Sequence, residues 1–205
     1  MTENRPFVLG LTGSIGMGKS TTAGFFRARG LPVWDADAAV HRLYGAGGAA
    51  VAPIAALCPG AIDENGVSRP RLRDWIARDA CAMTRLEQIV HPLVAKDRAD
   101  FIAAVGRENA PLVVVDVPLL FETGAEAMVD AVLVVTAPPE VQKARVLARE
   151  GMTESHFNQI LAKQMPDRQK RERADYIIET PTFEAAEQAV ERVLADIKQR
   201  IDQNA

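Results

Sequence analysis

Cysteine and aromatic residues are scarce in this chain. Among its 205 residues are two cysteines, and aromatic residues make up 5% of the total. The two cysteines, Cys58 and Cys81, lie far apart in the sequence and show no spacing typical of metal ligands. Both stand among apolar residues in segments that we expect to be helical, so we interpret them as buried, reduced thiols.

Long hydrophobic runs and a strong excess of one charge are also missing. No apolar run is long enough to span a bilayer, and the chain does not open with a signal peptide. The formal net charge of -3 argues against a general binder of nucleic acid or of membrane surfaces. With 48% hydrophobic and 25% charged residues, the composition is that of an ordinary globular protein, which we expect to work in the cytoplasm.

One stretch carries a complete glycine-rich motif. Residues 13–20 read G-S-I-G-M-G-K-S, which matches the pattern G-x-x-x-x-G-K-[ST] of a phosphate-binding loop. A short apolar run over residues 7–11 precedes it, and residues 21–29 have the apolar positions of a helix. Because strand, glycine loop and helix follow in this order, we interpret residues 13–20 as a phosphate loop rather than a chance turn.

The chemistry of such a loop follows from its backbone. Gly13, Gly16 and Gly18 have no β-carbon, so the chain can bend tightly and approach a polyphosphate closely. Backbone N–H groups and the start of the following helix then favour the negative charge. We expect Lys19 to reach the β- and γ-phosphates and the Ser20 hydroxyl to contact Mg²⁺. The loop therefore predicts a nucleoside triphosphate, with ATP and Mg²⁺ as the cofactors.

The remaining pattern indicates an α/β fold with a five-stranded parallel sheet. Five short apolar runs separated by helical segments predict the strands: 7–11, 31–34, 112–116, 131–135 and 176–178. A terminal helix over 183–201 has amphipathic spacing. In such sheets the ligands lie at the carboxyl ends of the strands, so Gly13, Asp35, Asp37 and Asp116 are expected to converge there.

The connection between the second and third strands is unusually long. A crossover needs about a dozen residues, and residues 38–110 form a mostly helical stretch several times that length. We expect segments 69–80 and 81–90 to be separate helices, and Pro92 to begin a further helix that runs to about residue 107. The sequence thus predicts a nucleotide-binding core of residues 1–37 and 111–205, with a lid at about 146–172, and a helical insertion of residues 38–110 that carries a second binding site.

Four acidic residues are candidates for the site. Asp35 and Asp37 follow the second strand, and one of them can cap the next helix while the other faces the substrate. We favour Asp37 as the carboxylate that accepts a proton from an attacking hydroxyl. Asp116 ends the third strand, where a phosphate-loop enzyme places an acid near Mg²⁺, although a simple turn residue is the alternative. Glu122 either lines the site or is solvated.

The basic residues of the second half are harder to assign. Arg145 and Arg149 are four residues apart and share a face of the predicted helix. Further basic residues follow between 163 and 173, mixed with acids, and most of them are expected to form a solvated face. An arginine in a closing lid can stabilise the charge of a phosphoryl-transfer transition state, and Arg149 is our candidate for that role.

Several motifs taken together resemble the dephospho-coenzyme A kinase family. They are the phosphate loop, Asp35-Ala36-Asp37, His91-Pro92, the run Asp116-Val117-Pro118-Leu119-Leu120-Phe121-Glu122, and Ala174-Asp175 before the last strand. The resemblance covers essentially the whole chain in order. It implies a three-layer P-loop kinase fold with a helical substrate-binding insertion and a lid.

The same resemblance implies an activity, in which the γ-phosphate of ATP is transferred to the ribose 3′-hydroxyl of dephospho-coenzyme A, the last step of coenzyme A synthesis. It assigns catalysis to Lys19, Asp37 and Arg149 and metal binding to Ser20 and Asp116. Nucleotide contacts are implied for Gly13, Ser14, Ile15, Gly16, Met17, Gly18, Lys19, Ser20, Thr21, Arg145 and Arg149. Substrate contacts are implied for Asp37, His91, Pro118 and Leu119.

The resemblance leaves one departure and two alternatives. Family members often carry asparagine-like residues after the last strand, where this chain has Glu179-Thr180-Pro181, so a contact from this turn to adenine is not expected. Another P-loop small-molecule or nucleoside monophosphate kinase would share the loop and the lid. A nucleotide-dependent switch protein would need a guanine-specific motif, which the sequence lacks. The expected partner is a small molecule, without nucleic acid or membrane, and the protein is expected to be a monomer or small homo-oligomer.

Overall fold

The chain folds into two compact units. The computed structural model describes residues 5–204. The larger unit comprises Met1–Trp34 and Ala104–Ala205, and we call it the sheet unit. The smaller unit, Asp35–Ala103, is mostly helical, and we call it the helical unit.

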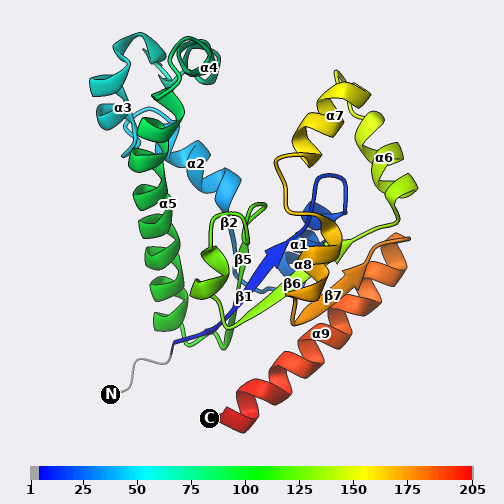
Figure 1. The fold of residues 1–205 in the computed structure, drawn as a ribbon. Coiled ribbons are helices and arrows are strands. Elements are labelled where there is room, and N and C mark those ends of the chain that lie inside the picture. Colours follow the sequence, from blue (N-terminus) through cyan, green and yellow to red (C-terminus); the bar gives the residue numbers. More distant parts are fainter. Residues whose placement is uncertain (1–4, 205) are drawn as a thin grey trace. The chain divides into compact units, whose positions relative to one another are not determined.

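A five-stranded parallel sheet forms the centre of the sheet unit (Figure 1). Its strand order is β2 (Val33–Asp35), β5 (Leu112–Asp116), β1 (Phe7–Thr12), β6 (Ala131–Thr136) and β7 (Tyr176–Glu179). In the parallel pair of β1 with β5, Leu11 lies opposite Asp116. The expected number and type of strands are therefore confirmed, and β1 stands at the middle of the sheet. Its carboxyl end leads directly into the phosphate loop.

Two helices cover one face of this sheet. They are α1 (Lys19–Ala28) and α9 (Phe183–Asn204), both labelled in Figure 1. Their buried side chains pack in one core with those of the strands. The apolar positions of α9 recur at helical spacing, and the helix buries Ala186, Val190, Val193 and Ile197 against this core. The chain between β6 and β7 forms α6 (Pro139–Leu147), α7 (Glu154–Leu161) and α8 (Asp167–Glu172).

The helical unit has its own core. Its elements are α2 (Ala36–Tyr44), α3 (Val51–Leu57), η1 (Pro59–Ala61), β3 (Ile62–Asp63), β4 (Gly66–Val67), α4 (Arg69–Arg78) and most of α5 (Ala82–Arg107). The buried residues of this core are Leu43, Ala50, Ile54, Ala61, Val67, Leu72, Leu86 and Val90. They come from nearly every element of the unit, so the unit buries apolar surface of its own.

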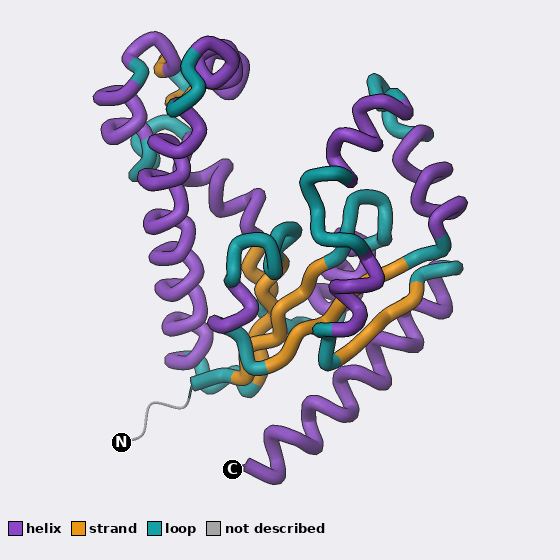
Figure 2. Tube along the Cα trace, in the orientation of Figure 1, coloured by secondary structure: helices purple, strands orange, loops and turns teal. Residues whose placement is uncertain are grey.

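The segment expected to be a turn-rich link contains a small hairpin. Strands β3 and β4 pair in antiparallel fashion, and Figure 2 shows them in orange among helices. Gly66 has φ 105°, and a β-carbon there would lie 2.2 Å from the Tyr44 carbonyl oxygen. Only glycine allows this close approach of two backbone segments. Such a short hairpin has no apolar run of its own, which is why periodicity did not reveal it.

The expected helix start at Pro92 is wrong. Pro92 lies inside α5, one helix of 26 residues that replaces the two segments expected on either side of it. Proline removes a backbone donor within a helix, which ordinarily favours a break. Here Leu86 and Val90 before the proline, and Leu93 and Val94 after it, pack in the same core. The shared burial keeps the helix continuous.

The expectation for the cysteines is also partly wrong. Both are free thiols, but Cys58 is half-buried and Cys81 is exposed. Cys81 lies in the turn between α4 and α5, outside the helix that would have buried it. Within residues 5–204, no helix is both long and apolar enough to cross a membrane.

Candidate active site

The phosphate loop has the backbone that its glycines predict. Gly16 and Gly18 adopt φ values of 78° and 90°, a region that side chains with a β-carbon rarely occupy. Gly18 is the N-cap of α1, which begins at Lys19. A β-carbon at Gly16 would lie 2.5 Å from a methyl group of Val146 on α6. Glycine is therefore required at residue 16 both by the turn and by the packing of α6.

Lys19 and Asp116 meet at the carboxyl edge of the sheet. The Lys19 Nζ lies 2.5 Å from the Asp116 Oδ1, and the Asp116 side chain is 3% exposed. Asp116 ends β5 and pairs in register with Leu11, so the strand pairing brings it beside the chain that enters the loop. The structure thus brings together the lysine expected to reach the phosphates and the acid expected near Mg²⁺.

Ser20 and Thr21 occupy the first turn of α1, directly after Lys19. Both residues are exposed. A hydroxyl oxygen at the N-terminus of a helix and a carboxylate at the end of a neighbouring strand are hard oxygen ligands of the kind that Mg²⁺ takes from proteins.

Among the described residues, no group of three or more His, Cys, Asp or Glu side chains could hold a metal ion. Mg²⁺ in kinases does not require such a cluster, because it keeps several waters and takes only one or two protein oxygens beside the phosphates. Asp116 is nearly buried, and its charge is balanced in the ligand-free protein by Lys19. Ser20 and Asp116 are the oxygen donors after the loop and at the end of β5 that could hold Mg²⁺ in this way.

Arg145 holds the turn that follows β7. Its guanidinium donates to the Thr180 hydroxyl at 2.9 Å and to the Thr180 carbonyl oxygen at 2.7 Å. The Thr180 hydroxyl in turn donates to the Met17 carbonyl oxygen of the phosphate loop at 2.9 Å. The turn Glu179-Thr180-Pro181 thus supports the phosphate loop through Thr180, and Arg145 holds that turn in place.

Arg149 lies beyond the end of its expected helix. Helix α6 ends at Leu147, so Arg145 and Arg149 do not share a helix face, contrary to expectation. The Arg149 N–H still bonds the Val146 carbonyl oxygen at 3.1 Å, and the side chain is exposed. The turn conformation of residues 148–151 ends the helix here, with Gly151 at φ 73°.

The two aspartates after β2 have different positions. Asp35 is the N-cap of α2, and its Oδ1 accepts from the Ala38 N–H at 3.0 Å. Asp37 lies in the first turn of α2 and is exposed. Capping is therefore the role of Asp35, which agrees with the division of roles that the sequence suggested.

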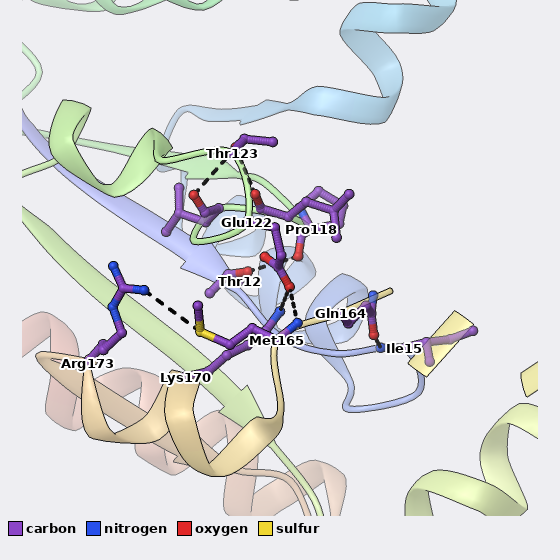
Figure 3. Close-up of polar contacts among 11 residues, drawn as sticks. Thr12, Ile15, Pro118, Glu122, Thr123, Gln164, Met165, Lys170 and Arg173 are labelled. Carbon is purple, nitrogen blue, oxygen red and sulfur yellow. Dashed lines mark hydrogen bonds and ion pairs between the residues drawn. The ribbon is translucent and has the colours of Figure 1, made fainter. Parts of the chain in front are cut away.

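His91 is exposed on α5 of the helical unit, next to Pro92. Pro118 and Leu119 follow β5 in the sheet unit. The Thr12 hydroxyl donates to the Pro118 carbonyl oxygen at 3.1 Å, which ties this segment to the end of β1 (Figure 3). Leu119 is 40% exposed, unusual for a large apolar side chain. The structure places Pro118 beside the entry to the phosphate loop.

Sequence reasoning missed a buried ion pair next to this segment. The Lys170 Nζ lies 2.9 Å from the Glu122 Oε1, and the Lys170 side chain is fully buried (Figure 3). The same Glu122 oxygen accepts from the Met165 N–H at 2.7 Å. Glu122 therefore neither lines an open site nor is solvated, and Lys170 departs from the solvated face expected of its basic neighbours. The sequence held no signal of this, because Lys170 is embedded in a run of exposed charges.

Electrostatics at Glu122 favour its charged form. Burial raises the pKa of Glu122, but the Lys170 ammonium and the N–H groups of Met165 and Glu122 itself together outweigh burial. The pKa of Glu122 consequently lies below its ordinary value. Glu122 is therefore ionised at neutral pH, and the pair joins the segment after β5 to α8.

Comparison with known proteins shows the family of this chain. The family model described as dephospho-CoA kinase matches residues 7–184. A dephospho-CoA kinase of Cereibacter sphaeroides is 59% identical over 198 residues, which are 97% of this chain and 99% of the relative. One of Jannaschia sp. (strain CCS1) is 56% identical, over 93% of this chain and 97% of the relative.

Solved structures show the same fold. A crystal structure from Thermus thermophilus is 34% identical, with a TM-score of 0.79, over 94% of this chain and 98% of that one. A dephospho-CoA kinase from Campylobacter jejuni is 20% identical, with a TM-score of 0.66 over 94% and 98% of the two chains, and supports the fold alone. The glycine loop, its lysine and the facing acid stand where the sequence motifs predict them, and the family match spans most of the chain. The chain therefore belongs to the dephospho-CoA kinase family and is an ATP-dependent kinase.

Proposed function

We propose that this protein transfers the γ-phosphate of ATP to the ribose 3′-hydroxyl of dephospho-coenzyme A, which yields coenzyme A and ADP. The observation that carries the proposal is the Lys19–Asp116 pair at the phosphate loop, in a chain of the dephospho-CoA kinase family. Phosphoryl transfer needs positioned cations and backbone donors around the phosphates more than covalent chemistry by the protein. The loop and Lys19 supply such groups.

The phosphate loop is the proposed ATP site. Residues 13–18 wrap the phosphates with backbone groups, and Lys19 directs its ammonium to the β- and γ-phosphates. The start of α1 adds its positive dipole end, with Ser20 and Thr21 in its first turn. When ATP binds, the Lys19 ammonium moves from the Asp116 carboxylate toward the phosphates, because both groups attract its positive charge. The energetic gain lies in the transition state, where negative charge moves onto the leaving oxygen.

Ser20 and Asp116 are the proposed protein ligands for Mg²⁺. They are a hydroxyl and a carboxylate, both oxygen donors, and Asp116 is held in place by β5. Bound Mg²⁺ would neutralise phosphate charge. Before ATP and Mg²⁺ bind, Asp116 has a second role, because its carboxylate holds Lys19 close to the loop in the ligand-free protein.

Asp37 is the proposed acceptor of the proton from the ribose hydroxyl. Asp35 already accepts a helix N–H, whereas Asp37 is exposed in the first turn of α2. A carboxylate at the reacting hydroxyl can take its proton as the new P–O bond forms. Arg149, which is exposed in the turn after α6, is proposed to stabilise the charge on the transferring group.

The substrate is proposed to bind through the insertion of residues 38–110 and the segment after β5. His91, Pro118 and Leu119 are the proposed contacts, in addition to Asp37. The exposed Leu119 offers apolar surface, and His91 offers a donor or acceptor. Residues of about 146–172 are proposed to act as a lid that excludes water when both ligands are present.

We further propose that the enzyme works in the cytoplasm as a monomer or small homo-oligomer, on a small-molecule partner and without nucleic acid or a membrane surface. The net charge of -3 supports the absence of nucleic-acid and membrane partners, because a negatively charged protein is not attracted to nucleic acid or to an anionic membrane surface.

The test of the proposed function is a product assay. Purified protein with ATP and Mg²⁺ is incubated with dephospho-coenzyme A, and products are followed by mass spectrometry together with ADP release. We expect a product heavier by one phosphate, and ADP release that requires the acceptor. ADP release without any phosphorylated acceptor would contradict the proposed substrate.

A further inference from the structure

Two glutamine side chains form hydrogen bonds with the backbone of one residue of the phosphate loop. The Ile15 N–H donates to the Gln164 Oε1 at 3.1 Å, and the Ile15 carbonyl oxygen accepts from the Gln142 Nε2 at 2.7 Å. Figure 3 shows the contact of Gln164 with Ile15. One amide side chain thus acts as an acceptor and the other as a donor. Both peptide groups of a single loop residue are bound by side chains more than a hundred residues away in the sequence.

A loop that wraps an anion needs partners for the backbone oxygens that do not face the anion. When N–H groups converge on phosphates, neighbouring carbonyl oxygens turn away and require donors elsewhere. In this loop the Ser14 carbonyl oxygen is bound by the Met17 N–H at 3.2 Å. The Met17 carbonyl oxygen is bound by Thr180, as described above, and the Ile15 carbonyl oxygen by Gln142. Gln142 therefore belongs to the set of donors that stabilise the bent backbone.

Gln142 lies just before the proposed lid, and Gln164 lies within it. Gln142 is 6% exposed and belongs to α6, which enters the lid segment. Gln164 lies between α7 and α8, inside the lid segment. Helix α6 also touches the loop at Gly16, where a β-carbon would lie 3.0 Å from the Gln142 carbonyl oxygen. The helix that leads into the lid and a residue within the lid are thus both attached to the loop, at neighbouring loop residues.

The backbone next to Gln164 is itself held in place by a hydrogen bond. The next residue, Met165, donates its N–H to Glu122, and Glu122 pairs with the buried Lys170 (Figure 3). The backbone at Gln164 is therefore anchored on the segment that follows β5. A glutamine side chain on an anchored backbone can present its oxygen to Ile15 at a fixed place, which a mobile surface residue could not do.

We propose that Gln142 and Gln164, which we call the glutamine clamp, are positioning residues. Through the two peptide groups of Ile15 they hold the phosphate loop in the conformation that binds ATP. This rests on the proposed use of the loop as the ATP site. The clamp acts on the loop backbone and through it on the phosphates. It also couples the loop to the helix that leads into the lid and to a residue within the lid, so that a shift of either segment moves Ile15.

The chemistry of the two contacts allows a matched test. Gln164→Glu keeps an oxygen that can accept from the Ile15 N–H. Gln142→Glu replaces the donor by a second oxygen, which faces the Ile15 carbonyl oxygen. Each variant adds one negative charge beside the same residue, so a general effect of charge on ATP is common to both. Gln142→Met and Gln164→Met remove either hydrogen bond without adding a charge.

The measurement is the affinity for ATP by calorimetry and the KM for each substrate, in the full-length protein. We expect Gln142→Glu, Gln142→Met and Gln164→Met to weaken ATP binding about three- to tenfold, the range for loss of one hydrogen bond. Gln164→Glu should retain more ATP affinity than Gln142→Glu by a similar factor. The KM for dephospho-coenzyme A should stay near that of the parent protein. Gln169→Glu and Gln169→Met, on the exposed face of α8, serve as controls.

Three outcomes overturn the proposal. Equal losses in the two glutamate variants would mean that charge alone acts. A lower melting temperature with unchanged ATP affinity would mean that the glutamines only stabilise the fold. Additive effects in Gln142→Met/Gln164→Met would show that the two side chains do not act through one shared residue. If the parent protein itself fails to bind ATP, the proposed ATP site fails, and that result is distinct from any of these.

Discussion

Lys19 and Asp116 form an ion pair of 2.5 Å in the ligand-free protein, between the residue that opens α1 and the residue that closes β5. The pair joins the two groups that are expected to act on phosphate and on Mg²⁺. Asp116 is nearly buried, so its charge needs a partner when no ligand is present. The lysine is thereby held near the loop before ATP arrives, which reduces the ordering required on binding.

Removal of the Lys19 ammonium is expected to abolish most of the activity. Lys19→Ala takes away a charge that acts more strongly in the transition state than in the ground state. We expect turnover to fall by orders of magnitude, measured as ADP release with saturating dephospho-coenzyme A. Circular dichroism should show an unchanged fold. Near-normal turnover in the folded variant would refute the role of Lys19.

The buried pair of Glu122 and Lys170 is expected to stabilise the fold. Lys170→Met leaves the Glu122 carboxylate largely buried without its cation, and we expect a loss of about 3 kcal/mol in the free energy of unfolding. That value is the low end of the usual range, because Glu122 keeps the Met165 N–H. Chemical denaturation measures it. Lys163→Met, at an exposed residue, is the control and should change stability little.

The same pair predicts a pH dependence. The pKa of Glu122 is lowered in the folded protein, so its contribution is fully present above the unfolded pKa, about 4.3. That contribution is lost as the pH falls through the folded pKa. Glu122→Gln should therefore show a flatter decline of stability in acid than the parent protein, although it is less stable at neutral pH. Parallel acid profiles for the two proteins would argue against an ionised, paired Glu122.

Asp37 and Asp35 are expected to differ in their effect on catalysis. Asp37→Asn keeps the shape of the side chain but removes the proton acceptor, and we expect turnover to drop about a hundredfold, the low end for a general base. Asp35→Asn should cost less, since asparagine also caps helices well. Thermal melts check that both variants fold. If Asp35→Asn is inactive while Asp37→Asn turns over normally, the roles are reversed.

His91 is expected to affect one ligand only. His91→Ala should weaken the binding of dephospho-coenzyme A in calorimetry and leave ATP binding nearly unchanged, because His91 belongs to the helical unit and the phosphate loop to the sheet unit. The side chain is exposed, so its removal should not unfold the protein. Equal losses for both ligands in a folded variant would indicate a general structural role.

Much of the fold could be predicted because the decisive signals are local. Residues 7–20 specify a strand, a glycine turn and a helix start within one short stretch, and the structure confirms all three. The five strands were visible as apolar runs, since strands buried on both faces need continuous apolar sequence. Pro92 is the opposite case, because its local preference to begin a helix lost to the burial of Leu86, Val90, Leu93 and Val94 in one core.

The sequence by itself determined where the phosphate loop, Lys19, Ser20 and an acid at the end of β5 lie along the chain, because all of them are readable from residue type and spacing. Only the tertiary structure decided which other residues support them. Gln142, Gln164 and Thr180 reach the loop from 127, 149 and 163 residues away, and Lys170 is buried within a run of charged residues. Contacts of this kind depend on how distant segments pack, and a polar side chain gives no sequence signal of whether its partner is water or a backbone group of another element.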